Sequence, residues 1–348
     1  MFARLVKLTV FLLLLGTAIA GGGFFRLQQW AHKPLDVPGE KIIELKAGTS
    51  LAALAGDLAE AGVVTNGAFF HVWVRFSGNY QKYQAGKYRF SGRYAPADVA
   101  DMMIRGEVWN PIVLQITIPE GFKLRDVAER LAGNGVGHIV EINHLFSDPG
   151  FLQSLHVPGA SLEGFLYPAT YSFHEMPTAM QALELMVKTF WQNLPKDYET
   201  SVKAKGLSLA EAVAFASLIE LETRQDDEKP LISEVIWRRL KDKVPLAIDA
   251  AIIYGIPDYD GTIRWSHLSD AKNPYNTRIH VGLPPTAIGA PSTKSLESVL
   301  IPTNFGYYYY VLIPGQGRHH FSKTLQEHNL HVKKLVNETK RLKGKEKN

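Results

Sequence analysis

The sequence predicts an α+β protein with an N-terminal transmembrane helix, a small α/β subdomain and a larger mixed α+β domain. Three observations carry this prediction: an uncharged N-terminal stretch, a strand–turn–helix pattern that occurs twice, and a helix-rich C-terminal half that closes with a hairpin pattern. The length of 348 residues allows two or three domains, and 46% hydrophobic and 11% aromatic residues are ordinary for a globular chain.

The N-terminal stretch Leu8 to Phe25 carries no charge and would be about 27 Å long as a helix at ~1.5 Å per residue. This length matches a hydrocarbon core of roughly 30 Å. Arg4 and Lys7 precede it, so the positive-inside rule places the N-terminus in the cytoplasm and the rest of the chain across the membrane. The alternative is a signal peptide cleaved after Ala20, and the sequence leaves this choice open.

The pattern divides the chain into six parts. We expect a membrane anchor over residues 1–25, a linker over 26–39, the α/β subdomain over 40–110, a second strand–turn–helix segment with its connector over 111–160, the main domain over 161–340 and a basic tail over 341–348. We expect residues 136–161 to be irregular. In the repeat, a strand and glycine turn over 42–51 and a helix over 52–61 correspond to 114–124 and 125–131. Between the copies, the pattern predicts a helix over 69–76, a strand over 83–90 and a helix from Ala95.

The most informative helix is predicted over 209–223, because Ser208 and Glu211 form a capping-box pattern before it. It carries Glu220 and Glu222 in the most apolar helical pattern after the anchor, where burying a carboxylate is costly. At ~100° per residue, Glu220 lies on the apolar stripe and Glu222 nearly opposite, so the two carboxylates cannot face one cleft on a regular helix. Burial disfavours the charged form, so we expect Glu220 to be the acid. The alternative is a glutamate neutralised in the core by an arginine, for which Arg224, Arg238 and Arg239 are available.

The remaining pattern predicts a helix over 230–240, polar turn clusters over 273–277 and 282–285, and a hairpin with strands over 307–313 and 319–321. A last helix begins at Thr324. Asp249 lies within an apolar run over 246–255 and is a possible second acid, remote from Glu220. The polar turns offer amide, hydroxyl and phenol groups that can bind sugars by hydrogen bonds.

Several function classes are disfavoured. The net charge of +4 comes without a basic stripe, so we expect no nucleic-acid partner. Cysteine is absent, and His319, His320 and His328 lack metal-ligand spacing, so we expect no metal. No GxSxG elbow, P-loop or dinucleotide fingerprint occurs, so we expect no organic cofactor. One strong acid candidate beyond a membrane anchor favours glycan cleavage.

The motifs Ala216–Thr223, Pro274–Thr277, Gly282–Pro285 and Ser322–Asn329, in this order, resemble those of the YceG-like endolytic murein transglycosylase family. The resemblance implies a LysM-like subdomain at 40–110 and a catalytic domain at 161–340. It also implies cleavage between N-acetylmuramic acid and N-acetylglucosamine in nascent peptidoglycan, with a 1,6-anhydro end and Glu220 as the single acid/base. The implied partners are glycan strands and peptidoglycan synthases, and the implied location is the inner membrane with the catalytic part on the periplasmic side.

The resemblance further implies a set of substrate-binding residues: Glu222, Arg239, Asp249, Tyr275, Asn276, Thr277, His319, Phe321, His328 and Asn329. The chain departs from the family pattern at Ala247, Ile248 and Ala250 beside Asp249, at Arg238, and at His320. Two alternatives remain at this point: a non-catalytic glycan-binding scaffold of cell-wall synthesis, and a muramidase that uses water with Glu220 and Asp249.

Overall fold

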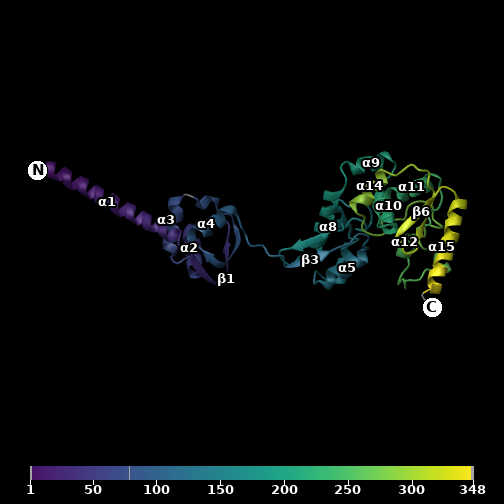
Figure 1. Ribbon diagram of the computed structural model, residues 1–348, viewed down its shortest axis with the longest axis horizontal. Coiled ribbons are helices and arrows are strands. Elements are labelled where there is room, and N and C mark those ends of the chain that lie inside the picture. The colour runs from purple at the N-terminus through teal and green to yellow at the C-terminus, as the bar shows by residue number, and fades with distance from the viewer. Residues whose placement is uncertain (1, 78, 346–348) are drawn as a thin grey trace. The chain divides into compact units, whose positions relative to one another are not determined.

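The computed structural model describes residues 2–77 and 79–345, and the side chains of residues 7–77 and 79–336. The chain forms two compact units, one up to Pro111 and one from Ile112 (Figure 1). Neither helix nor strand occurs between Gly106 and the strand that begins at Leu114. Each unit has its own hydrophobic core.

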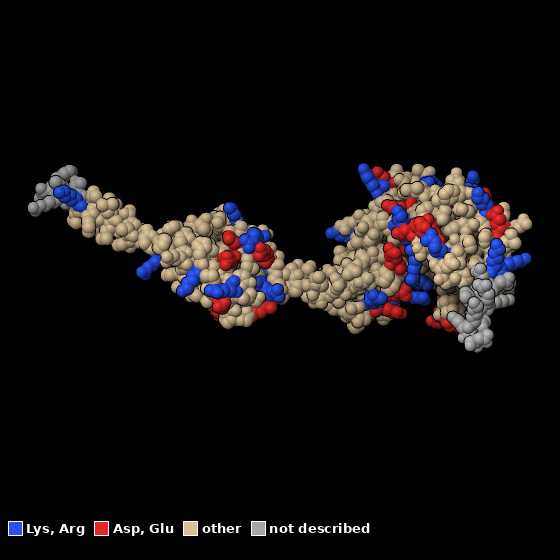
Figure 2. All heavy atoms as spheres, in the orientation of Figure 1, with Lys and Arg blue, Asp and Glu red and all other residues tan. Residues whose placement is uncertain are grey.

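The N-terminal unit begins with helix α1 (Phe2–Ala31), whose segment Lys7–Ala31 is long and apolar enough to cross a membrane, with a mean hydropathy of 2.0. Figure 2 shows its uncharged side chains in tan along most of the helix. The prediction of a linker over 26–39 is wrong. The helix continues to Ala31, and the indole of Trp30 donates a hydrogen bond to Thr65 across 2.8 Å. Strand β1 (Leu35–Leu45) then begins almost at once.

The rest of this unit is a two-stranded antiparallel sheet covered by helices. The elements after β1 are α2 (Leu51–Glu60), α3 (Gly67–Ser77), a 3₁₀ turn (Tyr80–Lys82), β2 (Gly86–Tyr94) and α4 (Pro96–Arg105). Gly48 takes a left-handed φ of 82°, and Ser50 then caps α2 by accepting a hydrogen bond from Ala53 N–H. The order of these elements, namely strand, helix, helix, strand and helix, agrees with the predicted order.

The second unit begins with a similar arrangement. Strand β3 (Leu114–Thr117) pairs antiparallel with β4 (Thr170–Phe173), and three short helices lie between them in sequence: α5 (Leu124–Gly133), α6 (Ile139–Leu145) and α7 (Pro149–Ser154). Residues 111–160 were expected to form a segment of their own, with 136–161 irregular. In the structure they contain α6 and α7 and share one hydrophobic core with the helices that follow, because β4 completes their sheet.

Helix α10 (Leu209–Glu222) is the centre of this unit. The helices around it in sequence are α8 (Ala179–Asn193), α9 (Tyr198–Ala204), α11 (Lys229–Lys241), α12 (Asp249–Tyr254), α13 (Trp265–Leu268) and α14 (Thr293–Leu300). Helices α9, α11, α12 and α14 all contact α10 (Figure 1). Every residue of α10 from Ala212 to Glu220 is buried, so the helix has no polar face, unlike the amphipathic stripe that we expected.

The chain ends with the predicted hairpin and helix. Strand β5 (Tyr309–Ile313) pairs with β6 (Arg318–Ser322), with Leu312 opposite His319. Helix α15 (Leu325–Lys345) packs against both strands. The basic tail expected over 341–348 forms the end of α15 as far as Lys345, and residues 346–348 lie outside the described residues.

Candidate active site

Glu220 lies near the C-terminal end of α10, with only 7% of its surface exposed. Local sequence explains the helix: Ser208 accepts a hydrogen bond from Glu211 N–H, and the Glu211 carboxylate accepts one from Ser208 N–H across 2.8 Å. The C-terminal end is also held. Thr223 Oγ1 donates to Glu228, which is itself buried and accepts hydrogen bonds from His319 N–H and the His319 ring.

The Glu220 carboxylate is surrounded by donors. Its Oε2 accepts hydrogen bonds from Ser292 N–H at 2.8 Å, from the Ser292 hydroxyl and from the Ser295 hydroxyl at 2.7 Å. Lys229 Nζ lies 3.3 Å from Oε1 and also donates to Ser292 Oγ at 2.9 Å. The carboxylate is therefore held in a fixed orientation.

Sequence reasoning missed these partners. We considered Arg224, Arg238 and Arg239 as the cations that neutralise Glu220 in the alternative reading, whereas the structure places Lys229 there. In the sequence, Lys229 follows three acidic residues, a pattern typical of a solvent-exposed lysine. In the structure, Lys229 is only 2% exposed. Ser292 and Ser295 have a recognisable signal, because Ser292 is the N-cap of α14 and accepts a hydrogen bond from Ser295 N–H.

A cavity of about 630 Å³ opens beside Glu220, and we call it the Glu220 cavity. It is lined by residues 119–121 and 220–225, with Leu312 and Gly317 from the hairpin. Glu120, from the turn between β3 and α5, also lines this cavity; burial raises the pKa of Glu120, and the negative charge of Glu220 adds to this rise. Glu222 also lines this cavity. The expectation that the two glutamates of α10 could not face one cleft is therefore wrong, because the end of the helix is enclosed on both sides.

A second cavity of about 350 Å³ shares Glu222 and Leu312 with the first, and we call it the Arg239 cavity. It brings together many of the predicted substrate-binding residues, namely Glu222, Arg239, Asp249, His319 and His328. Burial raises the pKa of Glu222 to about 7, and the negative charge of Asp249 adds to this effect. A hydrogen bond with Tyr310 and the charge of Arg239 oppose it.

The charges in the Arg239 cavity have defined partners. Arg239 donates to the Leu246 carbonyl oxygen at 2.6 Å and to that of Tyr308 at 3.1 Å. Asp249 accepts two hydrogen bonds from Arg278, at 2.7 and 3.1 Å. The His328 ring stacks on Tyr309, and burial, followed by the charge of Arg239, lowers the pKa of His328. Arg278 was not predicted as a site residue.

In the polar turn over 273–277, the side chains of Asn276 and Thr277 form hydrogen bonds with backbone groups of the protein. Asn276 is fully buried, and its amide group donates to the carbonyl oxygens of His267, Leu268 and Asp270. Thr277 is 2% exposed, and its hydroxyl pairs with both backbone groups of Ile248. Asn276 therefore fixes the backbone of residues 267–270, and Thr277 fixes that of Ile248, because these backbone groups need hydrogen-bond partners.

Three other predicted residues lie outside both cavities. Tyr275 forms a hydrogen bond with Thr286 and packs against Tyr254, with ring centroids 4.8 Å apart. Phe321 packs among aromatic side chains, with its ring centroid 5.5 Å from that of Tyr307. Asn329 is exposed on α15. Among the side chains described, those of residues 7–77 and 79–336, no three His, Asp or Glu groups gather closely enough to hold a metal ion.

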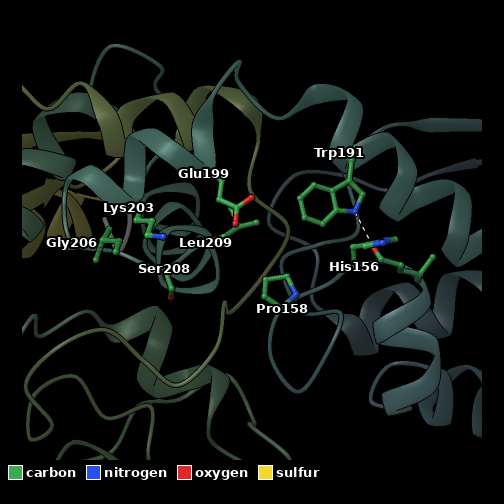
Figure 3. Close-up of a pocket in the computed structure, with 10 residues that line it drawn as sticks. His156, Pro158, Trp191, Glu199, Lys203, Gly206, Ser208 and Leu209 are labelled. Carbon is green, nitrogen blue, oxygen red and sulfur yellow. Dashed lines mark hydrogen bonds between the residues drawn. The ribbon is translucent and has the colours of Figure 1, made fainter.

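A larger cavity, of about 1000 Å³, contains none of the predicted site residues (Figure 3). It lies between Trp191 and the start of α10, and the Trp191 indole donates to the Leu155 carbonyl oxygen at 3.0 Å. Glu199 and Lys203 are its charged groups, and most of its wall is apolar. We place the active site at Glu220 because a buried carboxylate is held there by oriented donors at the wall of a cavity.

The fold and the site define an α+β protein with a buried, oriented carboxylate in a cavity at the end of its central helix. The YceG-like family model matches residues 43–334, and the chain belongs to this family. It is 27% identical to endolytic murein transglycosylases of Streptococcus pneumoniae, over 96% of this chain and 65% of the relative. The chain thus spans about two thirds of the length of these relatives, or slightly less.

Two further comparisons agree. The endolytic murein transglycosylase of Bacillus subtilis strain 168 is also 27% identical, over 90% of this chain and 91% of the relative. The crystal structure of a putative YceG-like protein from Listeria monocytogenes matches with a TM-score of 0.57 and 27% identity, covering 83% of this chain and 98% of that one.

Proposed function

We propose that this chain is an endolytic murein transglycosylase that cuts the bond between N-acetylmuramic acid and N-acetylglucosamine in nascent peptidoglycan. The names of its relatives support this proposal. The single observation that carries it at the site is Glu220, a buried carboxyl group held by oriented donors at the wall of the Glu220 cavity. A fixed carboxyl group of this kind is suited to general acid and base catalysis.

In the proposed reaction Glu220 acts twice. It first gives a proton to the glycosidic oxygen, so that the bond from this oxygen to C1 of N-acetylmuramic acid breaks. It then takes the proton from the 6-hydroxyl group of the same sugar, whose oxygen forms the new bond to C1. The product has a 1,6-anhydro end. The reaction consumes no water molecule and needs no second carboxylate.

The placement of Asp249 favours this reaction over hydrolysis. A muramidase needs a second carboxylate that flanks the same bond as the acid, about 5–9.5 Å from it. Asp249 lines the Arg239 cavity, not the Glu220 cavity, and both of its hydrogen bonds with Arg278 engage its Oδ1 atom. The geometry therefore gives no support to a muramidase that pairs Glu220 with Asp249.

We also propose roles for the N-terminal unit. Its order of strand, two helices and strand supports a LysM-like glycan-binding subdomain. The apolar helix α1 supports a single-pass anchor in the cytoplasmic membrane, and the basic residues Arg4 and Lys7 favour a periplasmic catalytic unit. An interaction with peptidoglycan synthases stays a prediction from the resemblance.

Mass spectrometry of peptidoglycan digested with the full chain in detergent tests the proposal. New 1,6-anhydro ends are the expected result. New reducing ends would instead identify a hydrolase, and no new ends together with retained glycan binding would identify a scaffold protein. Either of these two results would overturn the proposed reaction.

A further inference from the structure

Helix α3 of the N-terminal unit exposes an apolar face. One side of the helix packs into the core of the unit, whereas Phe69, Val72 and Phe76 are exposed, with 73% of the Phe76 surface open. Their spacing of three and four residues places them on one side of the helix, where a surface in water is normally polar. We call this side the α3 face. Among the described residues from 32 to 105, Ile42 is the one other large hydrophobic residue so exposed.

The α3 face adjoins the end of α1 (Figure 1). Three side-chain contacts join the two helices: the rings of Phe24 and Phe76 with centroids 6.3 Å apart, the Trp73 indole donating to Gln28 Oε1 at 3.2 Å, and the rings of Trp30 and Phe69 with centroids 5.6 Å apart. Along these contacts the residue numbers rise in α1 and fall in α3. The two helices are therefore antiparallel, and the C-terminal end of α3 points back along α1 toward its uncharged stretch.

That uncharged stretch sets the depth of the α3 face. Leu8 to Phe25 matches the thickness of the hydrocarbon core, so Phe25 lies at the outer boundary of this core in the proposed anchor. Phe76 contacts the neighbouring Phe24 and lies at the same boundary. Phe69 precedes it in α3 and lies about 10 Å further out at ~1.5 Å per residue, near the outer edge of the headgroup layer.

The side chains at this depth suit a phospholipid surface. Aromatic residues are enriched where a protein crosses the boundary between hydrocarbon and water, and contact with lipid spares their apolar surface from hydration. Arg26 and Arg75, each next to a phenylalanine of this boundary, are both exposed. A long cationic side chain can reach lipid phosphates there while its apolar stem lies along the hydrocarbon.

We propose that the α3 face lies against the phospholipid bilayer beside α1, with Phe76 at the boundary of the hydrocarbon core. The proposal rests on the proposed membrane anchor and goes beyond it, because a second helix then contacts lipid. The hydrogen bond from Trp30 to Thr65 ties the end of α1 to the same unit. The N-terminal unit is therefore held on the membrane surface by two helices and does not swing freely on one.

The absence of cysteine allows a direct measurement of depth. The variants Phe76→Cys, Val72→Cys and Ala68→Cys of the full chain are each labelled with a nitroxide in nanodiscs of phosphatidylethanolamine and phosphatidylglycerol. Ala68 is the matched control, because it is exposed at the other end of α3. Leu13→Cys in α1 reports whether the anchor spans the bilayer. Electron paramagnetic resonance measures the accessibility of each label to molecular oxygen, which concentrates in hydrocarbon, and to a water-soluble nickel chelate.

We expect the ratio of oxygen to chelate accessibility to be several-fold higher at position 76 than at position 68, with position 72 between them. Equal, water-like ratios at 76 and 68, with the label at 13 in the bilayer, would overturn the proposal and leave the anchor standing. A label at 76 that is protected from both probes would also overturn it, because the face would then contact protein. A water-like label at position 13 would refute the anchor, and this proposal with it.

A charge placed on the α3 face tests the same contact in a second way. Phe76→Asp should lower the accessibility ratio of the label at position 72 several-fold, because an ionised carboxylate is unfavourable at the hydrocarbon boundary. Ala68→Asp adds the same charge at the far end of the helix and should leave the ratio unchanged. Circular dichroism checks the fold, and the exposure of Phe76 means that its replacement opens no cavity in the core. An unchanged ratio in Phe76→Asp would contradict the proposal.

Discussion

Glu220 and Lys229 form a buried ion pair, with side chains 4% and 2% exposed. Taking both charges out of water is costly, and the hydrogen bonds from Ser292 and Ser295 offset part of this cost. Removing the charge of Lys229 would leave Glu220 buried without a cation, whereas Lys229 also lies 3.2 Å from the Asp226 carboxylate. The pair therefore couples the stability of the second unit to its chemistry.

At this scale we expect Lys229→Met to lower the free energy of unfolding of the second unit by about 3–5 kcal/mol. The control is Lys294→Met, which removes a half-exposed ion pair with Glu297 and should cost less than about 1 kcal/mol. Chemical denaturation followed by circular dichroism measures both. Equal stability of the two variants would show that Lys229 does not compensate the charge of Glu220.

Glu220→Gln should lower kcat by roughly 10²–10⁴-fold, because an amide group cannot transfer the proton. Its carbonyl oxygen can still accept from Ser292 and Ser295, so the circular dichroism spectrum should not change. Glu222→Gln is the matched control on the same helix and should have a milder effect. Near-normal formation of anhydro ends by Glu220→Gln would contradict the assignment of the acid.

At the scale of elements, the loop before Asn276 depends on one side chain. The Asn276 amide group donates to three backbone carbonyl oxygens of residues 267–270, which no strand or longer helix would otherwise satisfy. Thr277 next to it fixes the backbone before α12. The loop therefore positions Asp249, the first residue of α12, at the Arg239 cavity.

We expect Asn276→Ala to destabilise the second unit by about 1–3 kcal/mol, because the carbonyl oxygens of His267, Leu268 and Asp270 lose their shared donor. Thermal unfolding of this variant is compared with that of Asn329→Ala, which changes an exposed asparagine on α15. A variant with unchanged stability but a strongly raised KM would show instead that Asn276 contacts the glycan.

At the scale of the whole molecule, buried carboxyl groups make stability depend on pH. Burial raises the pKa of Glu163 from 4.5 to about 7, although hydrogen bonds from Tyr254 and Leu124 N–H oppose the rise. The folded state therefore binds a proton that the unfolded state has already released between these two pH values. The stabilisation is complete below about pH 4.5 and is lost as the pH rises to about 7. Glu222 acts in the same direction.

We expect the free energy of unfolding of the full chain in detergent to fall as the pH rises from about 5 to 8, with about 2–4 kcal/mol of the fall due to Glu163. Glu163→Gln should remove that part, and Glu184→Gln, an exposed change on α8, should leave it. A wild-type slope retained in Glu163→Gln would contradict this account.

The sequence by itself determined the local features. The capping box at Ser208, the apolar run after it and the glycine turns are short-range signals, so the helices, the hairpin and the choice of Glu220 could be predicted from them. Its weakest predictions concerned residues 26–39 and 136–161, where contacts distant in sequence extend α1 and support short helices.

Only the tertiary structure decided which groups surround Glu220. Ser292 lies 72 residues further along the chain, and the turn that carries Glu120 is hydrogen-bonded to Ala290 through Gly121 N–H. Asn276 and Thr277 have the polar groups of a glycan site, yet the folded chain uses them to pair buried backbone atoms. A side chain's type is local, but its hydrogen-bond partners and its burial depend on packing between distant segments.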